Sequence, residues 1–228
     1  MRQVASDEIL PSAGLTHDPA ITLALAYARA KDRPIFEDLF TLDRRLADAT
    51  RQASEPIIAQ MKLAWWRDRF AQYPAHWPKG EPLLARLAAW NGDVSQLGTM
   101  VDGWEALLAE GRLTDDAIRA FAEGRADAWA VAAESLGEPE PPVPDHAGLL
   151  WSYADLAQNC SSAEDAERVR ALAHSQSLLA QGQPPLPRVL RPFVVLGVLG
   201  RRSLAHARPI LGSGGDFLAA VRAGMLGR

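Results

Sequence analysis

Apolar residues recur at helical spacing along almost the whole chain, and this pattern limits the fold more than any other feature. Ala, Leu, Arg and Glu, which favour helices, are abundant, whereas runs of the β-branched residues that favour strands are nearly absent. Capping residues, glycines and proline-rich breaks divide the pattern into about eight to ten segments. The sequence therefore predicts an all-α fold without strands.

The predicted helices begin at capping residues or prolines and end at glycines or proline-rich breaks. They cover approximately residues 19–30, 32–52, 83–90, 94–110, 114–136, 145–159, 162–179 and 186–207, with a further helix capped by Ser54 and a short last helix after 215. In the helix that Ser54 caps, the apolar positions that recur at helical spacing are Ile57, Ile58, Met61 and Trp65.

The breaks between these helices are too short to require separate domains. Residues 1–16 are predicted to form a loose N-terminal leader, and residues 17–228 are predicted to form one helical bundle. The chain carries a single cysteine, Cys160, so it cannot form an intrachain disulfide. None of the five histidines has a second histidine three or four residues away, so no histidine metal site is expected.

Charge is distributed unevenly along the chain. The net charge of −4 predicts that nucleic acid is not a partner, but the segment from Leu186 to the C-terminus holds seven arginines against one acid, Asp216. The favoured interpretation of this basic segment is a solvated helix face, and the alternatives are contact with an anionic membrane surface or with an acidic partner. The most apolar stretch, residues 189–199, is too short to span a bilayer, and no signal peptide is evident. The expected location is cytoplasmic, with any contact at the inner membrane being peripheral.

Three stretches of the sequence carry a family resemblance. Residues 54–68 read SEPIIAQMKLAWWRD, residues 126–137 read ADAWAVAAESLG, and residues 186–192 read LPRVLRP. The first resembles the helix that follows the first aspartate-rich helix of the squalene/phytoene synthase family, and the others are similar to later helices of that family. The resemblance extends over about residues 20–222. It implies a single-domain helical bundle of the isoprenoid (trans-prenyltransferase) synthase type.

Active members of that family hold Mg²⁺ and a substrate diphosphate between two aspartate-rich helices. The resemblance places the first of these motifs on Ala47, Asp48 and Arg51, so the first and last aspartates of the motif are replaced. Asp43 also remains, but it lies five residues from Asp48, which is about 140° around a helix. The candidates for the second motif are Asp155, Glu164, Asp165 and Glu167. Capping explains the last three, because they lie in the first turn of a predicted helix.

The broken motifs lead to two hypotheses about function. In the first, the chain is a family member that has lost catalysis and acts as a scaffold, an assembly factor or a lipid binder. A branch that includes an assembly factor of mitochondrial complex I shows the same loss. Its partner would be an unidentified protein or an isoprenoid or other lipid ligand, and no cofactor is expected.

The alternative is an active enzyme that joins two prenyl diphosphates head to head in isoprenoid biosynthesis, with Mg²⁺ as cofactor. It requires at least three carboxylates to converge beside a deep cavity. The candidates are Asp43, Asp48, Asp102, Glu105 and Asp155. The family resemblance also names candidates for lining a prenyl cavity, although ordinary core packing is the favoured interpretation for them. These are Trp65, Trp104, Trp129 and Trp151.

Overall fold

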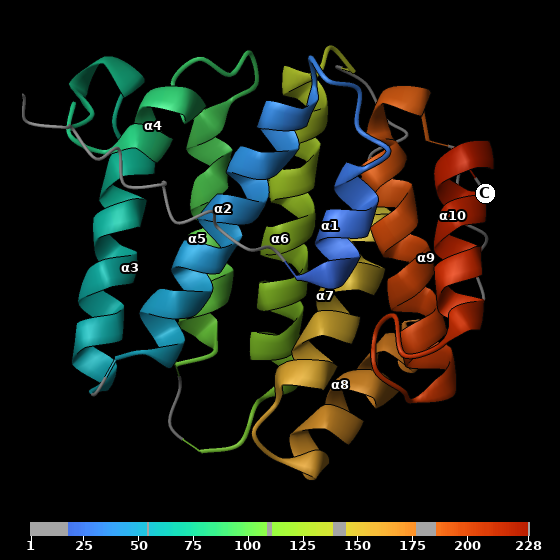
Figure 1. The fold of residues 1–228 in the computed structure, drawn as a ribbon. Coiled ribbons are helices and arrows are strands. Elements are labelled where there is room, and N and C mark those ends of the chain that lie inside the picture. The colour runs from blue at the N-terminus through green and yellow to red at the C-terminus, as the bar shows by residue number, and fades with distance from the viewer. Residues whose placement is uncertain (1–17, 54, 109–110, 139–144, 177–185, 228) are drawn as a thin grey trace, which may run out of the picture.

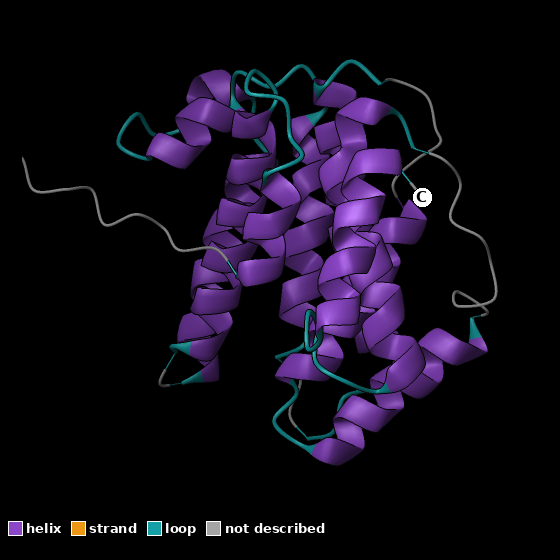
Figure 2. Cartoon of the chain, turned by 45° about the vertical axis from the view of Figure 1, so that its right-hand side comes forward, coloured by secondary structure: helices purple, strands orange, loops and turns teal. Residues whose placement is uncertain are grey.

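The computed structural model describes residues 18–53, 55–108, 111–138, 145–176 and 186–227, and all regular structure within these residues is helical (Figures 1 and 2). The α-helices are α1 (Pro19–Leu25), α2 (Arg33–Arg51), α3 (Pro56–Phe70), α4 (Pro82–Leu87), α5 (Gly98–Ala106), α6 (Asp115–Ser135), α7 (Asp145–Asn159), α8 (Ala163–Ser175), α9 (Arg191–His206) and α10 (Gly214–Leu226). The all-α prediction is therefore confirmed for the described part of the chain. The predicted leader over residues 1–16 and the predicted cap Ser54 lie outside it.

Local capping chemistry explains why several helices begin where they do. The Asp18 carboxylate accepts a hydrogen bond from the backbone N–H of Ala20 at 2.7 Å, and Pro19 occupies the first helical position. Thr114 Oγ1 accepts from the N–H of Ala117 at 3.1 Å and starts α6. Ser162 Oγ accepts from the N–H of Asp165 at 3.0 Å and starts α8. These starts agree with the sequence prediction.

Several predicted helix limits are wrong. The first helix ends at Leu25 instead of continuing to about residue 30, because the backbone N–H groups of residues 26–28 turn to acceptors three residues back. The helix predicted over 94–110 divides into a 3-10 turn (Val94–Leu97) and α5. The one predicted over 186–207 begins with a 3-10 turn (Arg188–Leu190) before α9. Such tight turns let the chain change direction without losing backbone hydrogen bonds.

Most of the bundle is one row of adjacent helices with others laid across it. From left to right in Figure 1, α3, α5, α6, α7, α9 and α10 follow one another, and each packs against the next. Helix α2 contacts α3, α5 and α6, and α1 contacts α9. This order leaves α3 and α10 at opposite edges of the bundle (Figure 1). Each of them therefore has a face that no other described helix covers.

Aromatic rings fill the middle of the bundle. Trp129 of α6 stacks on Phe193 of α9 with ring centroids 4.2 Å apart, and Phe36 of α2 meets Phe193 edge-on at 5.0 Å. Close helix contacts surround this cluster. At Gly124, where α6 meets α5, an added Cβ would lie 2.2 Å from the carbonyl oxygen of Thr99. No described helix is long and apolar enough to cross a bilayer.

Candidate functional site

Two aspartates from distant parts of the chain meet at one buried arginine. Asp43 comes from α2, Asp155 from α7, and Arg125 from α6, which lies between them. One terminal nitrogen of Arg125 donates to Asp155 Oδ2 at 2.9 Å, and the other donates to Asp43 Oδ2. Trp104 Nε1 donates to the second oxygen of Asp43 at 2.9 Å. Asp43 and Asp155, two of the candidate carboxylates, are thus joined through a guanidinium.

Burial sets the electrostatics of this cluster. The side chain of Arg125 is 3% exposed and that of Asp43 is 10% exposed. Burial raises the pKa of Asp43, and the opposing charge of Arg125 acts to lower it. For Arg125, burial disfavours the cation, but Asp43 and Asp155 overcome this effect and raise its pKa above the ordinary value. Arg125 is therefore a permanent cation at the centre of the bundle.

Arg125 was not among the residues singled out from the sequence. A signal for it exists, because Arg125 occurs four residues after Phe121 and four before Trp129, on the face of α6 that carries these buried residues. A lone cation on an apolar helix face indicates a buried ion pair. Which carboxylates it meets could not be read from this pattern.

The remaining candidate carboxylates do not join the buried cluster. Asp102 and Glu105 of α5 both pair with Arg67 of α3, Asp102 at 2.6 Å. Asp48 lies on a surface groove instead. Among the described residues, no group of three Asp, Glu, His or Cys side chains is placed to hold a metal ion. The convergence that the prenyl transferase alternative requires is not formed by these five carboxylates.

The acids at the start of α8 are engaged in a helix cap or in ion pairs. Asp165 belongs to the Ser162 cap, with Ser162 Oγ donating to Asp165 Oδ2 at 2.7 Å. Glu164 pairs with Arg112, and Glu167 pairs with Arg170 at 3.5 Å. The capping interpretation is therefore confirmed for Asp165, whereas Glu164 and Glu167 form ion pairs and Glu167 lies beyond the first turn of α8.

The four candidate tryptophans separate into two groups. Trp104, Trp129 and Trp151 are each at most 5% exposed and belong to the packed core. Trp104 meets Phe121 edge-on at 4.8 Å, which is ordinary aromatic packing. Trp65 is 38% exposed and lies at a groove on the surface. The structure therefore does not bring these four rings together around one cavity.

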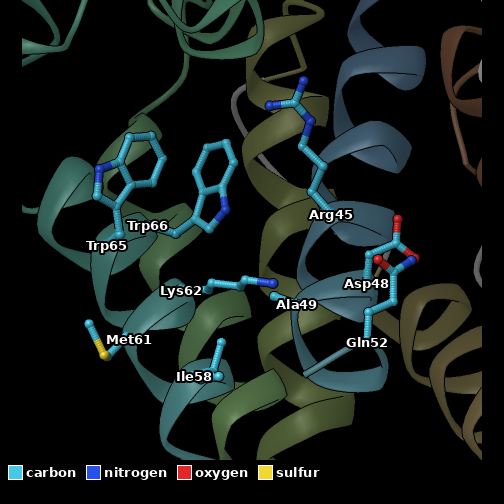
Figure 3. Close-up of a pocket in the computed structure, with 9 residues that line it drawn as sticks. All are labelled: Arg45, Asp48, Ala49, Gln52, Ile58, Met61, Lys62, Trp65 and Trp66. Carbon is cyan, nitrogen blue, oxygen red and sulfur yellow. The ribbon is translucent and has the colours of Figure 1, made fainter. Parts of the chain in front are cut away.

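A groove of about 570 Å³ runs between α2 and α3 (Figure 3). Its walls are Arg45, Asp48 and Ala49 from α2, Gln52 directly after α2, and Ile58, Met61, Lys62, Trp65 and Trp66 from α3. In Figure 3, Lys62 extends from α3 toward Ala49 across the groove. The groove combines an apolar wall with charged groups at its rim. Such a groove can bury apolar side chains of a partner while its rim binds polar groups.

Helix α3 has apolar residues on two opposite faces. Ala59, Leu63, Trp66 and Phe70 are buried against the bundle, at spacings of four, three and four residues. The positions expected from the sequence to form the apolar face are instead exposed: Ile57 by 54%, Ile58 by 37%, Met61 by 67% and Trp65 by 38%. The buried face already packs α3 against the bundle, so the second apolar face makes no comparable contact within the described residues. This exposed set, together with the groove, is called the α3 surface below.

Cations border the α3 surface and lie over its aromatic rings. The Arg69 guanidinium lies 5.6 Å from the ring centre of Trp65, and that of Arg45 lies 5.9 Å from Trp66. Arg45 also pairs with Glu81 at 2.6 Å, and Lys62 is the second cation that lines the groove. The surface is therefore apolar with a basic border.

Cys160 is not placed for chemistry. It is half-buried, and burial raises the pKa of its thiol to about 11. A thiol with so high a pKa holds little thiolate at neutral pH, so it is a poor nucleophile.

The chain was compared with known families and proteins. No family model matches it, and neither a curated protein nor a solved structure matches it. The similarity of residues 54–68 to squalene/phytoene synthases stays a prediction from the sequence.

Proposed function

We propose that this protein is a non-catalytic relative of the squalene/phytoene synthases that acts as a scaffold or assembly factor and binds a protein partner through the α3 surface. The observation that carries this proposal is the use of Asp43 and Asp155 as ion-pair partners of Arg125. Those aspartates come from the helices where the resemblance places the two metal motifs. A carboxylate that accepts hydrogen bonds from a buried guanidinium is not free to hold Mg²⁺ and a diphosphate.

The other carboxylates support the same proposal. Asp102 and Glu105 are engaged by Arg67, so of the five candidates only Asp48 makes no ion pair within the described residues. A single carboxylate does not form a cluster that bridges several metal ions to a diphosphate. The protein would retain the helical framework while its acidic residues hold that framework together.

The exposed α3 surface supports a binding role. Four large apolar side chains on one helix, beside a groove, are typical of a protein–protein interaction site. Their exposure costs free energy in the isolated chain, and burial against a partner recovers it.

The catalytic part of the proposal is tested by incubating the purified protein with farnesyl or geranylgeranyl diphosphate and Mg²⁺ and measuring released diphosphate. We expect no release above that of buffer alone. Release that scales with protein concentration and is lost in Asp43→Asn would establish the prenyl transferase alternative instead.

The binding part needs a separate measurement. A photo-crosslinking amino acid placed at Met61 in cells should give a discrete adduct with one protein partner. The same probe at Tyr73, which is 79% exposed beyond the end of α3, is the matched control. Equal labelling at both positions, or no adduct at Met61, would contradict a partner on the α3 surface.

A further inference from the structure

A second exposed surface lies at the opposite edge of the bundle, on α10 and the groove between α10 and α9 (Figure 1). On α10, Leu218 is 67% exposed and Met225 is 69% exposed, and they share one helix face with Arg222 at spacings of four and three residues. Phe217 and Leu226 are also at least half exposed. Helix α10 therefore presents apolar side chains outward, away from the bundle.

The groove beside this face is basic. It has a volume of about 470 Å³, and its lining residues are Val198, Arg201, Arg202, Ala205, His206, Ala219 and Arg222. None of these described lining residues is acidic. Asp216 neutralises part of the nearby charge by pairing with Arg202 at 2.7 Å and with Arg208 at 3.0 Å.

Two arginines of the groove are left without such a partner. Arg201 and Arg222 are exposed, and neither forms an ion pair within the described part of the chain. The two helices that form the groove, α9 and α10, contain Asp216 as their single acid. The groove thus carries an excess of positive charge that no described side chain offsets.

We propose that this face, formed by Leu218, Arg222 and Met225 of α10 with Arg201 of α9, docks on a membrane surface that contains anionic phospholipid. The arginines would bind lipid phosphates, and the α10 side chains would enter the boundary between headgroups and acyl chains. An apolar helix face with neighbouring cations is the pattern of helices that lie in a membrane interface.

Charge and polarity decide between this occupant and two others. A second copy packed symmetrically on the same face would bring the two sets of unpaired arginines together, and like charges repel. A free phosphate ion would be attracted by the arginines but would leave Leu218 and Met225 in water. An anionic membrane satisfies both features at once.

The test is co-sedimentation of the full chain with vesicles of phosphatidylcholine alone or with ~30% phosphatidylserine. The wild-type protein should bind only the anionic vesicles, and raising the salt from about 0.1 M to about 0.5 M should weaken binding. Arg201→Gln with Arg222→Gln should lower the partition coefficient about 25-fold, or about five-fold for each basic residue near the surface. Leu218→Ser with Met225→Ser should lower it about ten-fold.

Matched controls lie at the other edge of the bundle. Lys62→Gln with Lys79→Gln makes the same change in net charge, and Ile57→Ser with Met61→Ser makes a similar change in exposed apolar surface. Both should leave vesicle binding unchanged. The proposal is overturned if the controls weaken binding as much as the α9–α10 variants, or if neutral vesicles bind as well as anionic ones.

Two further results would identify another occupant and also overturn the proposal. One is a dimer in sedimentation equilibrium that Leu218→Ser with Met225→Ser converts to a monomer. The other is inorganic phosphate shifting the α9–α10 amide resonances while vesicles fail to bind. This surface is separate from the α3 surface and from the cluster around Arg125. The vesicle test is therefore independent of both the crosslinking experiment and the diphosphate-release assay.

Discussion

At the scale of single residues, Arg125 determines how the acidic residues of this chain are used. A guanidinium buried at the centre of a bundle requires carboxylate partners, because an unpaired buried charge is very costly. Asp43 and Asp155 fill that requirement, and Trp104 supplies a further hydrogen bond to Asp43. The four helices that provide these groups, α2, α5, α6 and α7, are joined by this one cluster.

Replacing Arg125 with Met should destabilise the protein by about 3–5 kcal/mol, since it leaves Asp43 buried without its cation. Urea denaturation followed by circular dichroism measures the loss. Arg168→Met is the control, because Arg168 pairs with Asp115 on the surface and should contribute at most ~1 kcal/mol.

Combining Arg125→Met with Asp43→Asn should cost less than the sum of the single changes, because the unpaired charge is removed together with its partner. Additive losses in the same denaturation experiment would show that Asp43 and Arg125 do not act as a unit.

At the scale of elements, close approach between helices explains where small residues are needed. Gly124 of α6 lies against the backbone of Thr99 in α5. In Gly124→Ala the new methyl group would overlap the carbonyl oxygen of Thr99, and the two helices would have to move apart. We expect a loss of about 2–3 kcal/mol in unfolding free energy. Gly98→Ala, at the start of α5 with open space around it, should instead stabilise by up to ~1 kcal/mol. Equal effects of the two substitutions would contradict the close contact.

The packing of α10 against α9 should contribute to stability in a way that depends on pH, through the ionisation of Asp216. Burial alone would raise the pKa of this carboxyl, but hydrogen bonds from Arg202 and Ser213, together with the charge of Arg208, lower it below the ordinary value. A lowered pKa in the folded state stabilises the fold at neutral pH, and this contribution disappears as the pH falls through the ordinary carboxyl range into the lower pKa of Asp216.

Asp216→Asn should therefore destabilise the protein by about 2 kcal/mol at pH 7 and by progressively less below about pH 4. Thermal unfolding of both proteins between pH 3 and pH 7 gives the comparison. A difference that stays constant across this range would mean that the ionised form of Asp216 is not what stabilises α10.

At the scale of the whole molecule, two exposed apolar surfaces lie at opposite edges of one row of helices (Figure 1). The α3 surface is groove-like with a basic border, and the α10 face stands beside an arginine groove. A protein that contacts a membrane at one edge and a protein partner at the other would suit the assembly role proposed above.

Neither surface should be needed for folding. Ile57→Ser with Met61→Ser should change the unfolding free energy by no more than ~0.5 kcal/mol per site, because both side chains are more than half exposed. The same variant should bind less of the dye 8-anilinonaphthalene-1-sulfonate, measured by its fluorescence. A large fall in thermal stability would show that the α3 surface is part of the core instead.

The helical fold class and several helix starts could be predicted from the sequence. The starts are predictable because caps such as Asp18, Thr114 and Ser162 act on backbone groups only two or three residues away. Helix ends were less predictable. The end of α1 depends on how the chain must turn toward α2, and the residues around it have good helix propensity whichever way the chain turns.

The candidate site, too, was predictable only in part from the sequence. The sequence pointed to Asp43 and Asp155 as candidates, but it did not identify Arg125 as their common partner. It predicted that Ile57, Ile58, Met61 and Trp65 form the apolar face of α3, whereas these side chains are exposed. With apolar residues on both faces of α3, periodicity alone does not choose between them.

Local features of the sequence were enough to predict the helical character of the described residues, the caps at Asp18, Thr114 and Ser162, and the basic character of the segment from Leu186 onward, because propensity, capping and charge act between near neighbours. Tertiary structure alone decided that Asp43 and Asp155 meet Arg125, that Ile57 and Met61 face outward, and that the arginines of α9 and α10 share one groove. These features depend on residues that lie far apart in the sequence, and only the packing of helices brings such residues together.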